Sequence, residues 1–394
     1  MTFLRLNSKR DIRHFAPKSN TFVGIAASIL LVGCTNTEYP EVFDSTILHE
    51  VTITVDATHL DQLAVDLENR VPGTIVYDGK ELVQVGIRQK GNTAIPLDQK
   101  PSFSVDFDEF DSKGDLHGFH KILLNSSKQD PTFLREKLAS EAHARAGLPA
   151  SRMVHAHVTF NGADAGLYVV AEAVDKDFLQ LHFGKDFDQG NLYEGPCCGD
   201  FAIDTGYRTT QLTLDDEVKD GRTRDDVNLL AKTIVSAPDA TFAADMTKIL
   251  DLEQYMKIYA LEVLLMHWDG YAFRGNNYYL YDNPADSRFV FFPHGMDRIL
   301  DDLSFQPTVQ NLAARLPARI RSNPMLDAQF QDLFTQLSLS AWDKTAMTAT
   351  IDSTVKMLHQ APAGPQTTKD LTLLDAELNG LQYTIKLYDA QLHP

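Results

Sequence analysis

The sequence predicts an α+β protein with a β-rich N-terminal region and a mostly helical C-terminal region. The first evidence is a series of β-favouring runs before residue 110, separated by Gly-containing turns. The second is an amphipathic stretch from residue 252, followed by further helical segments between residues 329 and 390. With 394 residues, 43% of them hydrophobic, the chain can bury one two-lobed domain or two modest ones.

The N-terminal segment indicates export. Basic residues between Lys9 and Lys18 precede an apolar stretch, residues 22–33, of the length of a signal-peptide core. Leu31 to Cys34 then resembles a lipobox, in which the cysteine is acylated; an ordinary short anchor helix is the alternative. We expect residues 1–34 to be a lipoprotein signal peptide and residues 35–49 a tether. A lipidated Cys34 would anchor the protein outside the cytoplasm, at the periplasmic face, the outer membrane or the cell surface of a bacterium.

The charge balance limits the partners. The chain has 54 acidic and 36 basic residues, a net charge of −18, which argues against nucleic acid because phosphate polymers would be repelled. We therefore expect contact with a membrane only through the lipid anchor. The other two cysteines, Cys197 and Cys198, are adjacent and offer neither a disulfide framework nor a zinc ribbon.

Residues 50–178 are expected to form the β-rich region. The predicted antiparallel sheet is followed by a helix that starts with Asp130 as N-cap and Pro131 at its first position, and that stops near Gly147. An Asn161-Gly162 dipeptide then predicts a hairpin. The expected strands are Val51 to Val55, Ile75 to Tyr77, Val83 to Arg88, Phe103 to Phe107, Met153 to Phe160 and Ala165 to Ala171.

Residues 179–310 are expected to hold the chemistry, and residues 311–394 to add further helices. A predicted helix, Leu252 to Met266, leads into His267-Trp268-Asp269 and a hairpin of two short strands, Tyr278 to Tyr281 and Arg288 to Phe292. The hairpin would return Asp297 to the neighbourhood of Asp269. A kinase needs this order of parts: one carboxylate to accept a hydroxyl proton, and a second to hold the Mg²⁺ that bridges nucleotide phosphates.

Several long motifs in a fixed order resemble the CotH family, the spore-coat protein H type of atypical protein kinase. The resemblance covers about Arg88 to Asp302 and implies a divergent, two-lobed protein-kinase-like fold. It also implies ATP with Mg²⁺ or Mn²⁺ as cofactors, and transfer of the γ-phosphoryl group to Ser or Thr of a protein acceptor. The matching motifs are KPSFSVDFDEF from Lys100, LLNSSKQDPTFLREKLA from Leu123, GLYVVAEAVDKDFL from Gly166, GNLYEG from Gly190, HWDGY from His267 and NNYYLY from Asn276.

The resemblance assigns roles to residues around the hairpin. Asp269 matches the catalytic aspartate that orients or deprotonates the acceptor hydroxyl. Asp297 matches the metal-binding aspartate, and Asn276 or Asn277 would complete the metal sphere. The chain departs from the family's PWDxD pattern, because Gly295 stands where most members have the first acid. If that first acid is the essential ligand, the chain is a pseudokinase; if the second is, Asp297 suffices.

The nucleotide clamp is less well defined by sequence. Residues 88–93 stand where a glycine-rich loop would, but contain one glycine, so cationic side chains must compensate. Arg88, Lys90 and Lys100 are the candidates, with Glu136 as ion-pair partner of the phosphate-contacting lysine. Residues 172–174, from Glu172 to Val174, resemble the hinge whose backbone would meet adenine. For each charged candidate, a solvated surface charge is the alternative.

Three functions fit these observations. The first is a lipid-anchored, extracytoplasmic protein kinase of the atypical type. The second is a catalytically inactive surface or assembly module that uses a kinase fold. Gly295 and the single glycine in the loop of residues 88–93 favour this function. The third is a transferase of the same fold that moves another group, such as AMP or glutamate.

Overall fold

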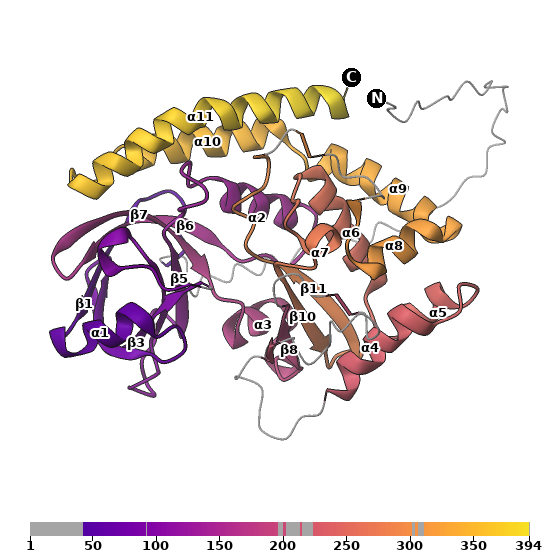
Figure 1. Cartoon of the computed structure of the whole chain (residues 1–394), viewed down its shortest axis with the longest axis horizontal. Helices are drawn as coiled ribbons and strands as arrows, with labels where there is room; N and C mark the ends of the chain where they lie inside the picture. Colours follow the sequence, from indigo (N-terminus) through magenta and orange to yellow (C-terminus); the bar gives the residue numbers. More distant parts are fainter. Residues whose placement is uncertain are drawn as a thin grey trace, which may run out of the picture. The chain divides into compact units, whose positions relative to one another are not determined.

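The computed structural model describes residues 42–91, 93–195, 200–201, 213–214, 224–301, 304–305 and 311–393. The expected signal peptide, its Cys34, most of the tether, and the pair Cys197 and Cys198 lie outside these ranges. The described chain is a mixed α+β structure, with a sheet-rich N-terminal part and a helical C-terminal part, as the sequence predicts (Figure 1).

The N-terminal part is a closed barrel with the strand order β1-β2-β3-β4-β5-β7-β6. Neighbouring strands are antiparallel except at the closure, where β1 and β6 run parallel, with Val51 opposite Val158. The predicted antiparallel sheet is therefore corrected to a barrel that contains one parallel pair. The strands are β1 (His49–Val55), β2 (Val71–Tyr77), β3 (Lys80–Lys90), β4 (Ser102–Asp106), β5 (Lys121–Asn125), β6 (Met153–Phe160) and β7 (Ala163–Glu172).

Alternation along the strands explains why they form a barrel. In β1 every second side chain, from His49 to Val55, is buried, while those between face outward. The predicted hairpin between β6 and β7 is confirmed: Asn161 and Gly162 both have positive φ, +47° and +78°. Asn161 also fixes β1, because its side-chain amide exchanges two hydrogen bonds with the backbone of Val55. The barrel interior is filled by residues such as Ile53, Ile75, Val85, Ile87, Phe103, Val105, Ile122, Leu124, Val154 and Val170.

The first long helix begins later than predicted. Helix α2 spans Arg135–Arg145, not a segment starting at Pro131. The reason is a left-handed residue, Phe133 with φ +59°, which interrupts the helical path before α2. Asp130 still acts on the helix start, since its carboxylate accepts from the backbone N–H of Leu134 (2.9 Å) and Arg135 (2.8 Å).

The predicted hairpin of the C-terminal part is confirmed. Strands β10 (Tyr278–Asn283) and β11 (Arg288–Pro293) are antiparallel, with Tyr278 opposite Pro293. They belong to a four-stranded sheet of order β11-β10-β8-β9, in which β8 is Leu192–Glu194 and β9 is Thr213–Leu214. Helix α6 (Leu252–Leu264), also predicted, packs against β11 and leads into the loop before the hairpin.

The remaining helices surround this sheet or pack on the barrel (Figure 1). Within the described residues, no helix is long and apolar enough to cross a bilayer. The helices are α1 (Leu60–Val65), α3 (Lys176–Phe183), α4 (Asp225–Ser236), α5 (Phe242–Met246), α7 (Tyr271–Arg274), α8 (Arg315–Ser322), α9 (Pro324–Ser340), α10 (Lys344–Leu358) and α11 (Pro365–Leu392).

Helix α11 contacts both parts of the molecule. Near its start, Asp164 of β7 accepts hydrogen bonds from the backbone N–H of Gln366 (2.8 Å) and Thr367 (2.9 Å). Near its end, Tyr388 donates to the backbone oxygen of Val263 in α6 (3.2 Å). Figure 1 shows α11 (yellow) alongside α10, running from above β7 to the C-terminal helices. The barrel and the helical part are thus tied together by one helix.

Candidate functional site

The loop between α6 and the hairpin is held by a buried carboxyl. Glu262, in the last turns of α6, accepts from the backbone N–H of Tyr271 (3.0 Å) and Ala272 (2.9 Å). Burial raises the pKa of Glu262 to about 8, against the effect of these two hydrogen bonds. Gly270 is needed beside it, because a Cβ there would lie 2.8 Å from the Glu262 carboxyl. Asp269 is consequently carried on a loop whose backbone is fixed from inside.

Asn277 joins the two ends of the hairpin. Its Nδ2 lies 3.1 Å from both the backbone oxygen and Oδ2 of Asp269, and 3.3 Å from the backbone oxygen of Gly295. All three neighbours are acceptors, so the amide orientation is set and Oδ1 is left to face a different partner. Of the two asparagines considered from sequence, Asn277 therefore makes these contacts, while Asn276 lies half-buried before it.

Gly295 has both a backbone and a steric reason to be glycine. Its φ is +56°, in the left-handed region that L side chains rarely adopt. A Cβ at this position would lie 2.6 Å from Oδ1 of Asn277. The Asn277 carbonyl thus occupies the space that a side chain at position 295 would need, which explains how the acid of the family pattern is absent here.

Asp297 lies in an acidic, partly desolvated environment. Its pKa is raised to about 7, first by burial and then by the carboxylates of Glu136 and Asp130, while Lys90 acts in the opposite direction. Burial also raises the pKa of Glu136, with Lys90 and a 2.8 Å hydrogen bond from Asn125 opposing it. The site therefore gathers more negative charge than its lysine neutralises.

Lys90, at the end of β3, is the cation at the centre of this arrangement. It makes no ion pair within 4.0 Å to any residue that the structure describes. Its charge nonetheless reaches Glu136, Asp297 and Glu194, since it opposes the rise in pKa at each of these carboxyls. Lys90 thus lies near several carboxylates without forming an ion pair within 4.0 Å to any of the described ones.

Arg298 connects the two aspartates predicted from sequence. The charges of both Asp297 and Asp269 contribute to raising its pKa, after the hydrogen bond that it donates to Asp301. Its guanidinium also lies over the ring of Trp268, 5.2 Å from the ring centre. Arg298 therefore feels the charges of both Asp269 and Asp297, while Asn277 holds Asp269 to the backbone of Gly295, two residues before Asp297.

Other residues considered from sequence lie elsewhere. Lys100 forms a 2.7 Å ion pair with Asp370 of α11, so the structure does not group it with Asp297. Arg88 donates to the backbone oxygen of Leu67 (2.9 Å), and its charge lowers the pKa of Glu194 against the effect of burial. Glu172, at the end of β7, is buried and holds Arg152 through its carboxylate at 2.6 Å.

The structure adds residues that sequence reasoning missed. Glu262 fixes the loop from a helix whose pattern looked purely structural, and Asp130 was interpreted only as an N-cap. His267 is buried, its pKa is lowered to about 4 by desolvation, and it hydrogen-bonds the backbone of Gly295. That contact links the loop before the hairpin to the turn after it. The signal available was the position of His267 two residues before Asp269, which alone does not reveal its partner.

The chemistry of the site suits a metal that is shared with a ligand. Within the described residues, no group of three or more His, Cys, Asp or Glu could hold a metal ion by itself. Mg²⁺ commonly takes one or two carboxylates and completes its octahedron with waters and substrate phosphates. Asp297 would be the carboxylate of such a set and Oδ1 of Asn277, which faces position 295, its amide oxygen; a cation would also relieve the excess of negative charge around Asp297.

The comparison with protein families assigns the chain to a family. The CotH family, described as CotH kinase protein, matches residues 87–385, which is more than half of the chain. The chain belongs to the CotH family. The match includes the end of β3, the hairpin and most of α11.

Curated relatives are similar at low identity. Inner spore coat protein H of Bacillus subtilis is 27% identical over 58% of this chain and 62% of its own length. Invasin CotH2 of Rhizopus delemar is 22% identical over 75% of this chain and 54% of its own, and Invasin CotH3 is 23% identical over 74% and 48%. The chain thus spans about half to three fifths of the length of these relatives.

Among solved structures, a chain from the Shewanella oneidensis HipA–HipB toxin–antitoxin complex with operator DNA is similar over 90% of this chain and 74% of that chain. The two are 11% identical, with a TM-score of 0.33. A similarity at that level does not support an assignment of fold or function.

Proposed function

We propose that this CotH protein is an atypical protein kinase with a divergent, two-lobed kinase-like fold, which transfers the γ-phosphoryl group of ATP to Ser or Thr of a protein. The observation that carries the proposal is the grouping of Asp269, Asn277 and Asp297 opposite Lys90 and Glu136. The barrel would be the N-terminal lobe, and the hairpin with its helices the C-terminal lobe. Membership of the family supports the same reading.

Each residue would have a distinct task. Asp269, held by Asn277, would accept or orient the proton of the acceptor hydroxyl. Lys90 would contact the phosphates, and Glu136 on α2 would keep it in place electrostatically. Asp297 and Asn277 would hold Mg²⁺ or Mn²⁺, which when bound supplies charge neutralisation for the phosphates. The order of these parts along the chain is the order that phosphoryl transfer requires.

The adenine would be met by the segment that joins the barrel to α3. Residues 172–174 begin with the last residue of β7, and Asp175 caps α3 by accepting from the backbone N–H of Asp177 (3.0 Å). The Val174 side chain is 8% exposed and packs with Phe178 and Leu192 in a small apolar cluster. A backbone fixed on both sides is suited to a ligand that is recognised by peptide groups.

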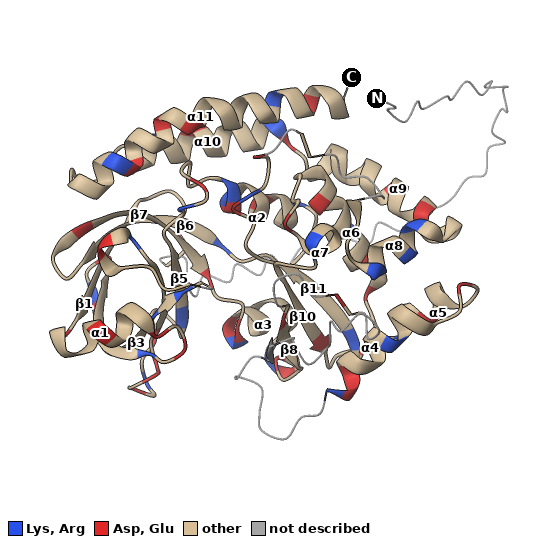
Figure 2. Cartoon of the chain, viewed as in Figure 1, with Lys and Arg blue, Asp and Glu red and all other residues tan. Residues whose placement is uncertain are grey.

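We further propose that the protein acts outside the cytoplasm, held by a lipidated Cys34. The names of its relatives, a spore coat protein and two invasins, are in keeping with a place at a surface. Figure 2 shows acidic and basic residues interspersed over the described elements, in keeping with a protein acceptor rather than a nucleic-acid partner.

The test is nucleotide binding and group transfer by protein lacking residues 1–34, with Mg²⁺ or Mn²⁺ and labelled ATP. Asp297→Asn should abolish metal-dependent ATP binding in calorimetry, because the metal loses its charged ligand. Asp269→Asn should largely keep ATP affinity and lower the transfer rate on the order of a hundredfold or more. Wild-type protein that binds no nucleotide with either metal would contradict the proposal.

The position of Gly295 favours a second candidate, an inactive kinase-fold module used for surface binding or assembly. Its backbone and the contact with Asn277 leave no room for a second acid there. The outcome that identifies this candidate is the absence of label transfer by the wild-type protein, whether or not ATP binds. Transfer of label from the α-phosphate instead would indicate a nucleotidyl transferase.

A further inference from the structure

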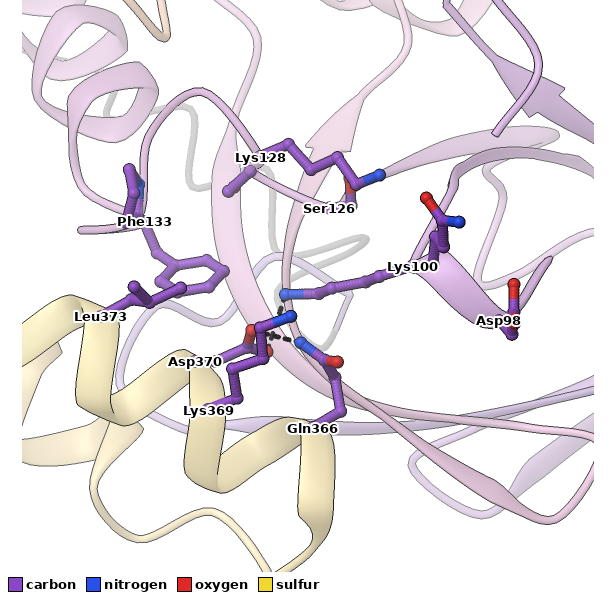
Figure 3. A pocket seen from close by; sticks show the side chains of 12 residues that line it. Asp98, Lys100, Ser126, Lys128, Phe133, Gln366, Lys369, Asp370 and Leu373 are labelled. Atoms are coloured by element: carbon purple, nitrogen blue, oxygen red, sulfur yellow. Dashed lines mark hydrogen bonds and ion pairs between the residues drawn. The ribbon is translucent and has the colours of Figure 1, made fainter. Parts of the chain in front are cut away.

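A cavity of about 350 Å³ lies between the barrel and the N-terminal half of α11 (Figure 3). Its walls come from residues 98–100 just before β4, from residues 126–133 before α2, and from residues 366–373 of α11. Its lining shares no residue with the candidate kinase site described above, since Lys90, Glu136, Asp269, Asn277 and Asp297 are absent from it.

A buried lysine forms one wall. The Lys100 ammonium lies 2.7 Å from Oδ2 of Asp370 and over the rings of Phe133 (4.8 Å) and Tyr168 (5.2 Å). Its side chain is 8% exposed. The pKa of Lys100 is lowered to about 8, chiefly by burial and also by the charge of Lys369, although Asp370 and Asp164 act in the opposite direction. The lysine is thus a cation that its surroundings only partly compensate.

Asp370, the ion-pair partner of Lys100, also accepts hydrogen bonds from neutral donors. Its Oδ2 accepts from the backbone N–H of Leu167 (2.8 Å) as well as from Lys100. Its Oδ1 accepts from the side-chain amide of Gln366 (2.8 Å). One carboxylate therefore accepts from one main-chain amide and one side-chain amide in addition to the ammonium. Among the residues that the structure describes, Lys369 beside it has no ion pair within 4.0 Å.

Two more lysines border the same space. Figure 3 shows Lys128 on one side of Lys100 and Lys369 on the other, next to Asp370, while Asp98 stands at the far edge. Lys128 and Lys369 are both exposed at the rim. In a chain with a net charge of −18, the lining of this cavity has three lysines and two aspartates, Asp98 and Asp370, and is therefore positively charged overall.

We propose that this cavity binds a phosphomonoester group. Such a group carries about −1.5 to −2 charges at neutral pH and would be attracted by Lys128 and Lys369, the two exposed lysines of the lining, since lysine binds phosphate as a point charge. A free inorganic anion would leave much of the cavity unfilled. The apolar side chains of Phe133 and Leu373 in its walls suit the carbon part of a phosphorylated small molecule or amino acid. Binding here would join the barrel to α11 through a shared anion.

The test titrates the full-length protein, without nucleotide or metal, with inorganic phosphate and with O-phosphoserine, followed by calorimetry. L-serine serves as the uncharged-group control. We expect saturable binding, with O-phosphoserine tighter than phosphate. Lys369→Ala should weaken it about fivefold or more. Lys386→Ala, an exposed lysine further along the same helix and outside the cavity, should leave it unchanged.

Two results would overturn the proposal. One is equal affinity in wild type and Lys369→Ala, or no saturation by either phosphate compound. The other is loss of binding in Lys90→Met, which removes the lysine proposed to contact the nucleotide phosphates, and which would mean that the compounds occupy the candidate nucleotide site instead. Retained binding in that variant supports the cavity whatever the outcome of the kinase test, so the two proposals fail separately.

Discussion

The barrel and the candidate site treat their carboxyl groups in opposite ways. In the barrel, Asp78 bonds His49 (2.6 Å) and the backbone N–H of Glu50 (2.8 Å), and these contacts outweigh burial and lower its pKa. At the site, burial raises the pKa of Asp297 and of Glu262, and the available partners do not compensate. The barrel's charges therefore stabilise the fold, whereas those at the site are kept in a state that favours a bound cation or ligand.

The largest expected effect of this contrast is on the pH dependence of the free energy of unfolding. Glu262 keeps its proton in the folded protein up to about pH 8, but the unfolded chain releases it near pH 4.5. Its stabilising contribution is therefore full below pH 4.5 and is lost as pH rises to 8. Since one pKa unit is worth about 1.4 kcal/mol, Glu262→Gln should gain a few kcal/mol relative to wild type over that range. Urea unfolding at several pH values measures this difference.

Asp78→Asn in the barrel is the matched control, with the opposite sign. The pKa of Asp78 is lowered on folding, so its contribution is present above pH 3.8 and is lost as pH falls below that value. The free energy of unfolding of Asp78→Asn should be lower than that of wild type at neutral pH, and this difference should become smaller in acid. If the difference in unfolding free energy between Glu262→Gln and wild type did not change with pH, the two backbone donors would keep the Glu262 carboxylate ionised.

The second test removes the uncommitted cation. Lys90→Met should raise the pKa values of Glu136 and Asp297 further and weaken ATP binding roughly thirtyfold, because a charge-assisted contact is worth about 2 kcal/mol. NMR titration of the carboxyls and calorimetry with ATP measure both effects. Lys80→Met, at the other end of β3, removes a lysine that donates to the backbone oxygen of Asp115. If the two variants behaved alike, Lys90 would have no special place in the site.

The smallest expected effect comes from alanine substitutions at two glycines, which distinguish backbone strain from steric crowding. Gly79 and Gly295 both have positive φ, +85° and +56°, so alanine at either position should cost about 1 kcal/mol of stability. Only at Gly295 would the added Cβ press on Asn277, since nothing lies within 4 Å of a Cβ at Gly79. ATP affinity should fall several-fold in Gly295→Ala and stay constant in Gly79→Ala. Equal affinities would mean that Asn277 can move without consequence.

Local pattern made much of the fold predictable. The strands of the barrel, its Asn161-Gly162 turn and the β10–β11 hairpin follow from alternation and turn residues within short windows. The closure of the barrel did not follow, because β1 pairs in parallel with β6, about a hundred residues away. Strand β5 also escaped prediction: it is short, and its polar end, Asn125, continues into a loop.

The site was predictable only in part for the same reason. The order of Asp269, the hairpin and Asp297 is written along the chain, so their common neighbourhood could be inferred. The different surroundings of Lys90 and Lys100 could not be inferred, because the ion-pair partner of Lys100 lies on α11. Asp370, which takes up Lys100, is 270 residues further along the chain. Asp130 and Glu136 likewise reach Asp297 only through the packing of the segment around α2.

That separation has a consequence for folding kinetics. The hairpins of the barrel form between neighbouring strands, whereas Lys100 and Leu167 meet Asp370 across 270 and 203 residues of chain. Closing such long loops is slow, so α11 is expected to dock after the barrel has formed. Until it does, the face of β6 and β7 that carries Met153, Leu167 and Val169 is uncovered. The half-assembled protein would present an apolar patch, making that interval the one most exposed to aggregation and to proteases.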